Sequence, residues 1–276
     1  MACWQRLSFA LGSALIVACG GTGSAVRSDG GAPESGADGG LVDSIAESAP
    51  RSYVGSFIAL QYNGYDVAGS VVASQDAPTC QLGVPSGSCC YVSGSSTGGP
   101  HEYFAGSVAV KDGTTTLALM TEDPGGGYHV ASTATPALTW SSGDTLGLSA
   151  AGDPSGVAAF MLGAAAPAAI SGESPTIGGP YGTSVGRPFT IAWPSVGAGD
   201  KVTLHLFNFD QPGDLFCTTD DATGTLTVDY SLMKYFPIGM TGTIDLFRES
   251  VATVAAQNTT VTLWVATALH SNALFQ

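Results

Sequence analysis

The sequence predicts an all-β protein with two β-sandwich domains, and three observations lead to this fold class. Apolar residues alternate with polar ones in many short segments, which is typical of strands with one buried face. The 38 glycines and 15 prolines separate these segments at intervals of about 8–12 residues, as in sandwiches. Charged residues make up 11% of the chain and hydrophobic ones 44%, which excludes both a coiled coil and a disordered acidic protein.

In the first half, alternating segments come in pairs separated by turn residues. Residues 53–72 predict a strand, an Asn-Gly turn and a second strand, because Asn-Gly between alternating segments is typical of a two-residue hairpin. Asp112-Gly113 predicts another turn, between alternating segments at 108–110 and 117–119. Further alternating pairs are Tyr128/Val130, Leu138/Trp140 and Leu146/Leu148.

The second half repeats this alternation. The apolar sets that predict its strands are Phe189/Ile191/Trp193, Val202/Leu204/Leu206, Leu226/Val228, Ile244/Leu246 and Val261/Leu263/Val265. Residues 231–236 alone have the character of a single helical turn. The alternation is lost between residues 168 and 180, where glycine and proline accumulate. We therefore expect an N-terminal sandwich over 51–170 and a C-terminal one over 171–276.

The N-terminus has the pattern of an export signal. One positive charge, Arg6, precedes an apolar stretch over residues 7–18, which is too short to span ~30 Å of hydrocarbon. The stretch ends in Ile16-Val17-Ala18-Cys19, which resembles the lipobox of bacterial lipoproteins. The resemblance implies that residues 1–18 are a lipoprotein signal peptide and that Cys19 becomes the acylated first residue. Gly20 after the cysteine implies, by the same resemblance, an outer-membrane location.

Residues 19–50 predict a flexible linker behind the anchor. Small and acidic residues dominate this segment, so it cannot bury enough apolar surface to offset its ordering entropy. We expect it to hold the folded part away from the membrane, to which the acyl chains attach without a membrane-spanning helix.

The cysteines predict disulfide bonds, because an exported chain enters an oxidising compartment. Apart from Cys3 in the signal and the lipidated Cys19, the cysteines are Cys80, Cys89, Cys90 and Cys217. We favour Cys80 with Cys89 or Cys90, since the Gly/Pro/Ser-rich segment between them bends back easily. Cys217 then takes the left-over partner or stays buried and unpaired. No CxxC pair or histidine spacing favours zinc.

Residues 172–276 resemble fibronectin type III and other immunoglobulin-like modules. The resemblance rests on FTIAWPSVGAGDKVTLHLF, in which Trp193 is expected to point inward from an early strand. The whole chain is similar to uncharacterised two-sandwich envelope lipoproteins of bacteria, which implies an envelope location and no particular activity.

Two segments match the Gly-x-Ser-x-Gly pattern of serine hydrolases, around Ser96 and Ser184. That motif requires a sharp turn from a strand into a helix. Gly99-Pro100 follows the first match and Arg187-Pro188 the second, and neither opens a helix well. We interpret both as chance matches in a Gly- and Ser-rich chain.

Acidic loop residues are the candidate metal ligands. Calcium binds several converging oxygens, and part of such a set could come from Asp210, Asp214, Asp220 and Asp221. The chain has no complete calcium-loop pattern, however, and Asp beside Gly or Pro is ordinary in turns. Our prediction is no metal and no cofactor, with these residues as weak calcium candidates.

The four histidines are expected to be single surface or core residues. They are His101, His129, His205 and His270, and no two have i,i+2 or i,i+4 spacing. His205 alternates with Leu204 and Leu206, which places it on the other strand face, at the surface. Phe207 and Phe209 share that face and suggest that the strand is covered on both sides.

Aromatic residues close in sequence could form a carbohydrate platform. Two such pairs are Tyr62 with Tyr65 and Phe207 with Phe209, although core or edge packing explains them more simply. A calcium- or carbohydrate-binding surface module is accordingly the alternative to the main hypothesis, and an envelope hydrolase is a further, less favoured one.

The main hypothesis is a lipid-anchored envelope protein of non-enzymatic, structural or interaction type. The lipobox, the linker and the lack of a coherent catalytic set support it. Lys and Arg number 8 against 22 Asp and Glu, for a net charge of −14, which excludes a phosphate-binding surface for nucleic acid. The expected partners are the membrane, through the anchor, and a protein or glycan ligand.

Overall fold

A computed structural model describes residues 7–10, 13–16, 52–73, 88–93, 103–121, 127–131, 138–154, 156–178, 182–197, 199–209 and 213–276. The short strands β1 (Leu7–Ala10) and β2 (Ser13–Ile16) pair with each other in antiparallel fashion. The other described strands form three further sheets.

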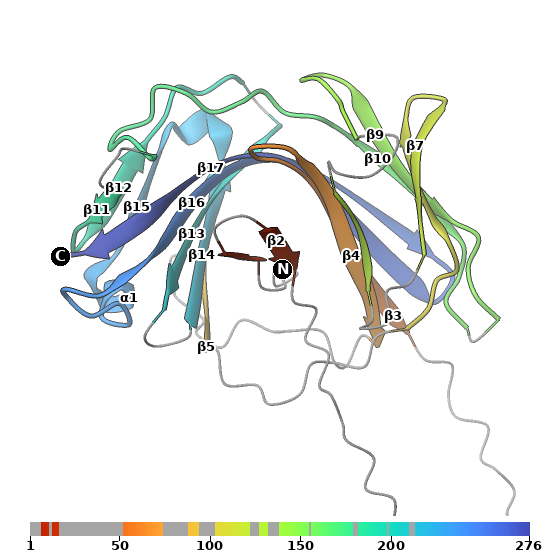
Figure 1. Cartoon of the computed structure of the whole chain (residues 1–276), viewed down its shortest axis with the longest axis horizontal. Helices are drawn as coiled ribbons and strands as arrows, with labels where there is room; N and C mark the ends of the chain where they lie inside the picture. The colour runs from red at the N-terminus through yellow and green to blue at the C-terminus, as the bar shows by residue number, and fades with distance from the viewer. Residues whose placement is uncertain are drawn as a thin grey trace, which may run out of the picture.

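The largest of these sheets has nine strands. Its order from edge to edge is β5 (Cys89–Ser93), β14 (Gly213–Asp220), β13 (Lys201–Asn208), β16 (Thr241–Ala256), β17 (Thr259–Phe275), β3 (Tyr53–Gln61), β4 (Tyr65–Ala73) and β8 (Tyr128–Ala131), and β11 (Thr183–Val185) pairs with the end of β17. Figure 1 shows that this sheet bends into an arch, which the long strands β16 and β17 cross from one side to the other.

Two smaller sheets lie on the convex side of the arch (Figure 1). One has the order β10 (Phe160–Ala165), β9 (Thr145–Ala150), β6 (Val108–Asp112) and β7 (Thr115–Met120). The other pairs β12 (Phe189–Ala192) with β15 (Thr225–Val228). The described helical segments are the 3-10 turn η2 (Asp221–Thr223) and the single turn α1 (Tyr230–Met233).

Each smaller sheet encloses a hydrophobic core against the large one. In the first core, Phe57 of β3 and Val261 of β17 pack with Leu148 and Phe160 of the four-stranded sheet. In the second core, Leu204 and Leu206 of β13, Ile244 of β16 and Phe275 of β17 pack with Ile191 of β12. Strand β17 thus supplies apolar residues to both cores, because its odd-numbered side chains share one face along its whole length.

The predicted all-β, sandwich-like fold class is confirmed. The hairpin over 53–72 forms as β3 and β4, with Asn63 and Gly64 at positive φ values of 45° and 156° in the turn. The turn at Asp112-Gly113 joins β6 to β7, and the helical turn within 231–236 forms as α1, one residue earlier. Trp193 points inward, with 5% of its surface exposed.

One predicted strand is wrong. Leu138 and Trp140 are buried as their alternation suggests, but residues 138–140 form no strand. The domain limits at residue 170 stay a prediction; β5, from the first half of the sequence, pairs with β14 of the second half. No helix among the described residues is long and apolar enough to cross a membrane.

Candidate functional site

The large sheet has a second face that does not belong to either main core, and it carries buried polar side chains beside a small apolar cluster of Leu60, Phe247 and Ala266. Because side chains alternate along a strand, Thr203 and His205 of β13 point away from Leu204 and Leu206, which lie in the second core. Both smaller sheets lie on the convex side (Figure 1), so this second face is the concave one. We call it the inner face.

Four charged or titratable side chains form a hydrogen-bonded network across the inner face. Nε2 of His205 lies 2.9 Å from Oδ1 of Asp214, on β14, and its Nδ1 lies 2.9 Å from Oδ2 of Asp245, on β16. The other oxygen of Asp245, Oδ1, lies 2.5 Å from Nδ1 of His270, on β17. Phe216 stacks on the His205 ring at a centroid distance of 4.4 Å. The network therefore joins four adjacent strands, β14-β13-β16-β17.

The geometry makes His205 an imidazolium. Each ring nitrogen faces a carboxylate oxygen, and a neutral imidazole has only one N–H to donate. Burial alone would lower the pKa of His205, whose exposed fraction is 2%, but the hydrogen bonds and charges of Asp214 and Asp245 outweigh burial and raise the pKa to about 9. The sheet thus holds a buried positive charge between two carboxylates.

Asp245 is the centre of the network, because both of its oxygens accept hydrogen bonds from histidines. Burial would raise its pKa, but the hydrogen bonds from His205 and His270 and their charges lower it below the ordinary value. His270 is the member nearest solvent, with 17% of its side chain exposed. The ring of Tyr62 packs edge-on against it at 5.4 Å, and burial together with the charge of Asp245 raises the pKa of Tyr62.

Further along the same strands, Thr203, Thr218 and Glu249 form a second group of polar side chains on the inner face. Thr203 donates to Oε1 of Glu249 at 2.7 Å, and the hydroxyls of Thr203 and Thr218 lie 2.7 Å apart. Burial raises the pKa of Glu249 to about 7, against smaller opposing effects of the Thr203 hydrogen bond and the Lys201 charge. Lys201 itself pairs with Asp220.

On the opposite face of β16, Arg248 is buried, with 1% of its surface exposed. It donates from Nε to Oδ1 of Asp221 at 3.0 Å and to the carbonyl oxygens of Ala168, Ala169 and Pro194 at 3.2, 3.0 and 2.8 Å. Arg248 thus fixes the backbone of Ala168 and Ala169, which follow β10 and the first core, against the second core.

Asp221, which pairs with this arginine, also accepts several other hydrogen bonds. Burial would raise its pKa, but the backbone N–H of Val196, the Arg248 charge and the hydroxyl of Ser195 lower it. The hydrogen bond from Val196 to its Oδ2 is 2.7 Å long and that from Ser195 is 3.1 Å long. This fully hydrogen-bonded ion pair is structural in character.

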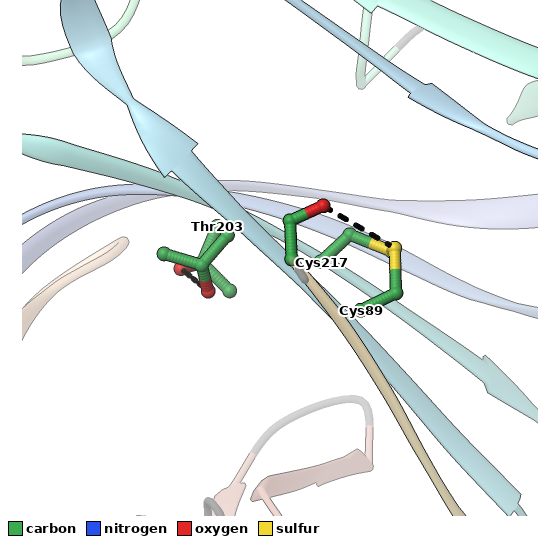
Figure 2. Close-up of a disulfide and its surroundings, with 5 residues drawn as sticks. Cys89, Thr203 and Cys217 are labelled. Carbon is green, nitrogen blue, oxygen red and sulfur yellow. Dashed lines mark hydrogen bonds between the residues drawn. A yellow bond between two sulfur atoms is a disulfide. The ribbon is translucent and has the colours of Figure 1, made fainter. Parts of the chain in front are cut away.

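A disulfide joins Cys89 of β5 to Cys217 of β14, which are partners in the strand register. Figure 2 shows this bond on one side of the strands and Thr203 on the other. Of the two alternatives for each cysteine, the pairing of Cys80 with Cys89 and an unpaired Cys217 are therefore wrong, whereas the bond agrees with the alternative in which Cys217 takes a left-over partner. The physical reason is that β5 crosses to the edge of β14, a long-range pairing that brings the two residues together. Cys80 lies outside the described residues, and its pairing with Cys90 stays a prediction.

The structure describes three of the four weak calcium candidates and does not gather them into a metal site. Asp214 and Asp220 stand at opposite ends of β14, and the three candidates that the structure describes each face a different cation: Asp214 bonds to His205, Asp220 to Lys201 and Asp221 to Arg248. Asp210 lies outside the described residues. Within the described ranges no group of three or more His, Cys, Asp or Glu residues is placed to hold a metal ion.

The two serine motifs find no support in the described geometry. Ser184 lies exposed in the middle of β11, which pairs with β17. The chain continues from there into β12 rather than into a helix, so the sharp strand-to-helix turn is missing at Ser184. Ser96 lies outside the described residues, as does Cys19.

The expectation that His205 is at the surface is wrong. It lies opposite Leu204 and Leu206 as expected, but it is buried, because the polar and aromatic side chains of neighbouring strands surround it. His270 shares Asp245 with it, a relationship that no sequence spacing predicted. The available signal was the aromatic character of Phe207 and Phe209 on the same face, which indicates a strand covered on both sides. His129 lies in β8 and His101 lies outside the described residues.

Of the two aromatic pairs, one is separated in the structure and the other stays in contact. Tyr62 contacts His270 on the inner face, whereas Tyr65 packs against the first core, so these two do not form one platform. Phe207 and Phe209 contact each other edge-on at 5.6 Å, and Phe209 is 52% exposed.

The chain matches no model of a known protein family. A comparison with curated proteins likewise finds no significant relative.

Proposed function

We propose that the protein is a lipid-anchored protein of the bacterial cell envelope that acts as a non-enzymatic structural or interaction module. The lipobox-like Ile16-Val17-Ala18-Cys19 segment is the observation that carries the anchor. In this proposal the linker over 20–50 holds the arched fold away from the membrane, and the fold provides the surface that binds a partner.

The disulfide supports the export that this function requires. Disulfides persist in oxidising compartments such as the bacterial periplasm and the cell surface, and they are rare in the cytosol. The bond between Cys89 and Cys217 ties the edge strand β5 to β14. Strand β5 contributes Cys89 and Tyr91 to the second core. An oxidising compartment would therefore stabilise the fold by preserving the bond that attaches β5.

The inner-face network supports a structural rather than a catalytic use of its charges. A catalytic base needs a free position from which it takes a proton. In His205 both ring nitrogens are committed to carboxylates, and in Asp245 both oxygens are committed to histidines. These groups satisfy one another and fix the strand register of the arch. The ligand that we propose for the module is a protein or a glycan.

Metabolic labelling with radioactive palmitate tests the anchor. The wild-type chain, expressed in a Gram-negative host, should incorporate label and sediment with the outer membrane. Cys19→Ala should abolish labelling, whereas Cys3→Ala, which changes a cysteine within the signal, should leave it intact. Unchanged labelling of the Cys19→Ala variant, or no labelling of the wild type, would refute the proposed anchor.

A further inference from the structure

One edge of the four-stranded sheet is open to solvent. Strand β7 ends this sheet, and no strand among the described residues pairs with its outer edge. The main-chain N–H and C=O groups along such an edge are a template for a further strand. Thr115, Thr116 and Thr121 are exposed, and Leu119 has 65% of its surface exposed. Another polypeptide can therefore reach the edge of β7.

Strand β7 lacks the features that protect exposed edges. Proteins protect such edges with lysines, prolines or a covering segment, but the sequence of β7, Thr-Thr-Leu-Ala-Leu-Met, has no charged residue and no proline. Its pairing with β6 is irregular near the turn, and from Ala118 to Met120 the register is regular. The opposite edge strand, β10, is engaged at its end, where Ser250 donates to the carbonyl oxygen of Ala165.

The outward side chains beside this edge are apolar or small. Register places Met161, Ser149, Ala109 and Leu119 in one row across the four strands. The row faces outward because the alternate side chains, such as Val110, lie in the first core. Met161 is 74% exposed. The row carries no charge, and Leu119 stands at its end on the open edge.

Chemistry and charge favour a second copy of this chain as the occupant. The edge groups pair with a polypeptide main chain, whose N–H and C=O groups alternate in the same way. The chain has a net charge of −14, so two copies repel each other where their carboxylates meet. Strand β7 and the outward row offer a contact without a carboxylate. The charges of the adjacent strand β6, Lys111 and Asp112, are opposite in sign.

Strand β7 is complementary to itself in an antiparallel pair. A two-fold axis at Leu119 places this residue opposite Leu119 of the second copy, and it places Ala118 opposite Met120. The faces of the two sheets then match, since Leu119 points outward whereas Ala118 and Met120 belong to the first core. The opposed leucines bury apolar surface that each separate copy exposes.

We propose that two copies of the chain associate through β7, which pairs with itself and joins the two four-stranded sheets into one continuous sheet. Strand β7 has six residues and is about 20 Å long. The contact therefore falls short of the roughly 1,200 Å² at which stable interfaces begin, and the dimer is weak and reversible. The proposal goes beyond the lipid anchor and does not depend on it.

Cysteine cross-linking of the full-length chain tests the register. Directly opposed residues of antiparallel strands have Cβ atoms about 4.5–5.5 Å apart, which is within reach of a disulfide after a small adjustment. Leu119→Cys, treated with a mild oxidant, should give a disulfide-linked dimer that is absent from the wild type. Met161→Cys is the matched control, because Met161 is the more exposed residue at the other end of the row, and it should give no dimer.

Sedimentation velocity of the purified full-length chain in mild detergent measures the association itself. The wild type should shift towards a dimer as its concentration rises. Leu119→Lys places a charge at the centre of the pair and should weaken association at least about tenfold, whereas Met161→Lys should leave it unchanged. Both residues are exposed, so the fold tolerates both lysines. Added salt should strengthen association, because it screens the repulsion between two chains of charge −14.

The contrary outcomes are distinct. A chain that stays monomeric at every concentration overturns the proposal and leaves the edge to another occupant. Equal weakening by the two lysine variants places the contact on the outer face instead of the edge, and a dimer that Leu119→Lys does not weaken lies elsewhere; either result overturns the pairing of β7. Palmitate labelling is unaffected by all of these results, so the anchor and the dimer are tested separately.

Discussion

His205 and Asp245 face each other across β13 and β16 as register partners, with Nδ1 of the imidazole 2.9 Å from Oδ2 of the carboxylate. Both residues are 2% exposed, and Asp214 engages the other side of the ring. The sheet therefore encloses a charge that it stabilises by direct pairing, and this makes the inner face sensitive to single substitutions and to pH.

Asp245→Asn should destabilise the protein strongly. The change removes the counter-charge that both histidines share, and breaking one partner of a buried ion pair costs about 3–5 kcal/mol. Urea unfolding at pH 7 measures the loss, and nitrogen-15 NMR should show the pKa of His205 falling from about 9. Asp220→Asn is the matched control, because its pair with Lys201 is exposed and should contribute no more than about 1 kcal/mol. Equal effects of the two variants would contradict the account.

The charge of His205 should make the free energy of unfolding decrease at alkaline pH. Its pKa in the folded state, about 9, lies above the ordinary value of 6.5, so its stabilising contribution is complete below pH 6.5 and is lost as the pH rises through 9. The two values differ by about 2.5 units, or roughly 3 kcal/mol in the free energy of unfolding. The difference between wild type and His205→Gln isolates this contribution from other titrating groups. A difference that stays constant from pH 6 to pH 10 would exclude a buried imidazolium.

Removal of the disulfide should release the edge strand β5. The bond closes a loop with a sequence separation of 128 residues, for which the chain-entropy model gives roughly 5 kcal/mol. The double variant Cys89→Ala/Cys217→Ala should lose stability of that order, and amide hydrogens of residues 89–93 should exchange faster with solvent. Chemically reduced wild type should behave like the variant. Unaltered exchange in β5 after reduction would show that pairing with β14 alone holds the strand.

Arg248→Met should cost about 3–5 kcal/mol, because it leaves Asp221 buried without its cation. Thermal unfolding of the variant measures the loss. The double variant Arg248→Met/Asp221→Asn removes both charges and should recover part of the stability. Lys201→Met, which removes a cation from an exposed pair, is the control and should change stability by less than about 1 kcal/mol. No recovery in the double variant would mean that the carbonyl contacts of Arg248, rather than its ion pair, carry the effect.

Local pattern predicted most of the fold. The alternation of Val202, Leu204 and Leu206 identified β13, and the Asn-Gly pair identified the turn between β3 and β4. These elements depend on side-chain period and turn chemistry, which act over a few residues. Residues 138–140 show the limit of this reasoning, since an irregular segment also buries alternate side chains when it runs over a core.

The polar network of the inner face could not be predicted, because it depends on pairing between strands that are far apart in the sequence. His205 and Asp245 are 40 residues apart, and Asp245 and His270 are 25 apart; they meet because three strands adopt one register. The disulfide depends in the same way on β5 joining β14. Arg248 did carry a usable signal, because it shares the apolar parity of Ile244 and Leu246, and a charge at such a position indicates a buried ion pair.

Mass spectrometry of the intact protein, extracted from membranes without reducing agent, tests the lipid anchor and the disulfide together. We expect a chain that begins at Cys19 with acyl groups attached and in which a peptide containing Cys89 is linked to one containing Cys217. An unmodified chain that begins at Met1, with the thiols of Cys89 and Cys217 reduced, would contradict both the anchor and the compartment.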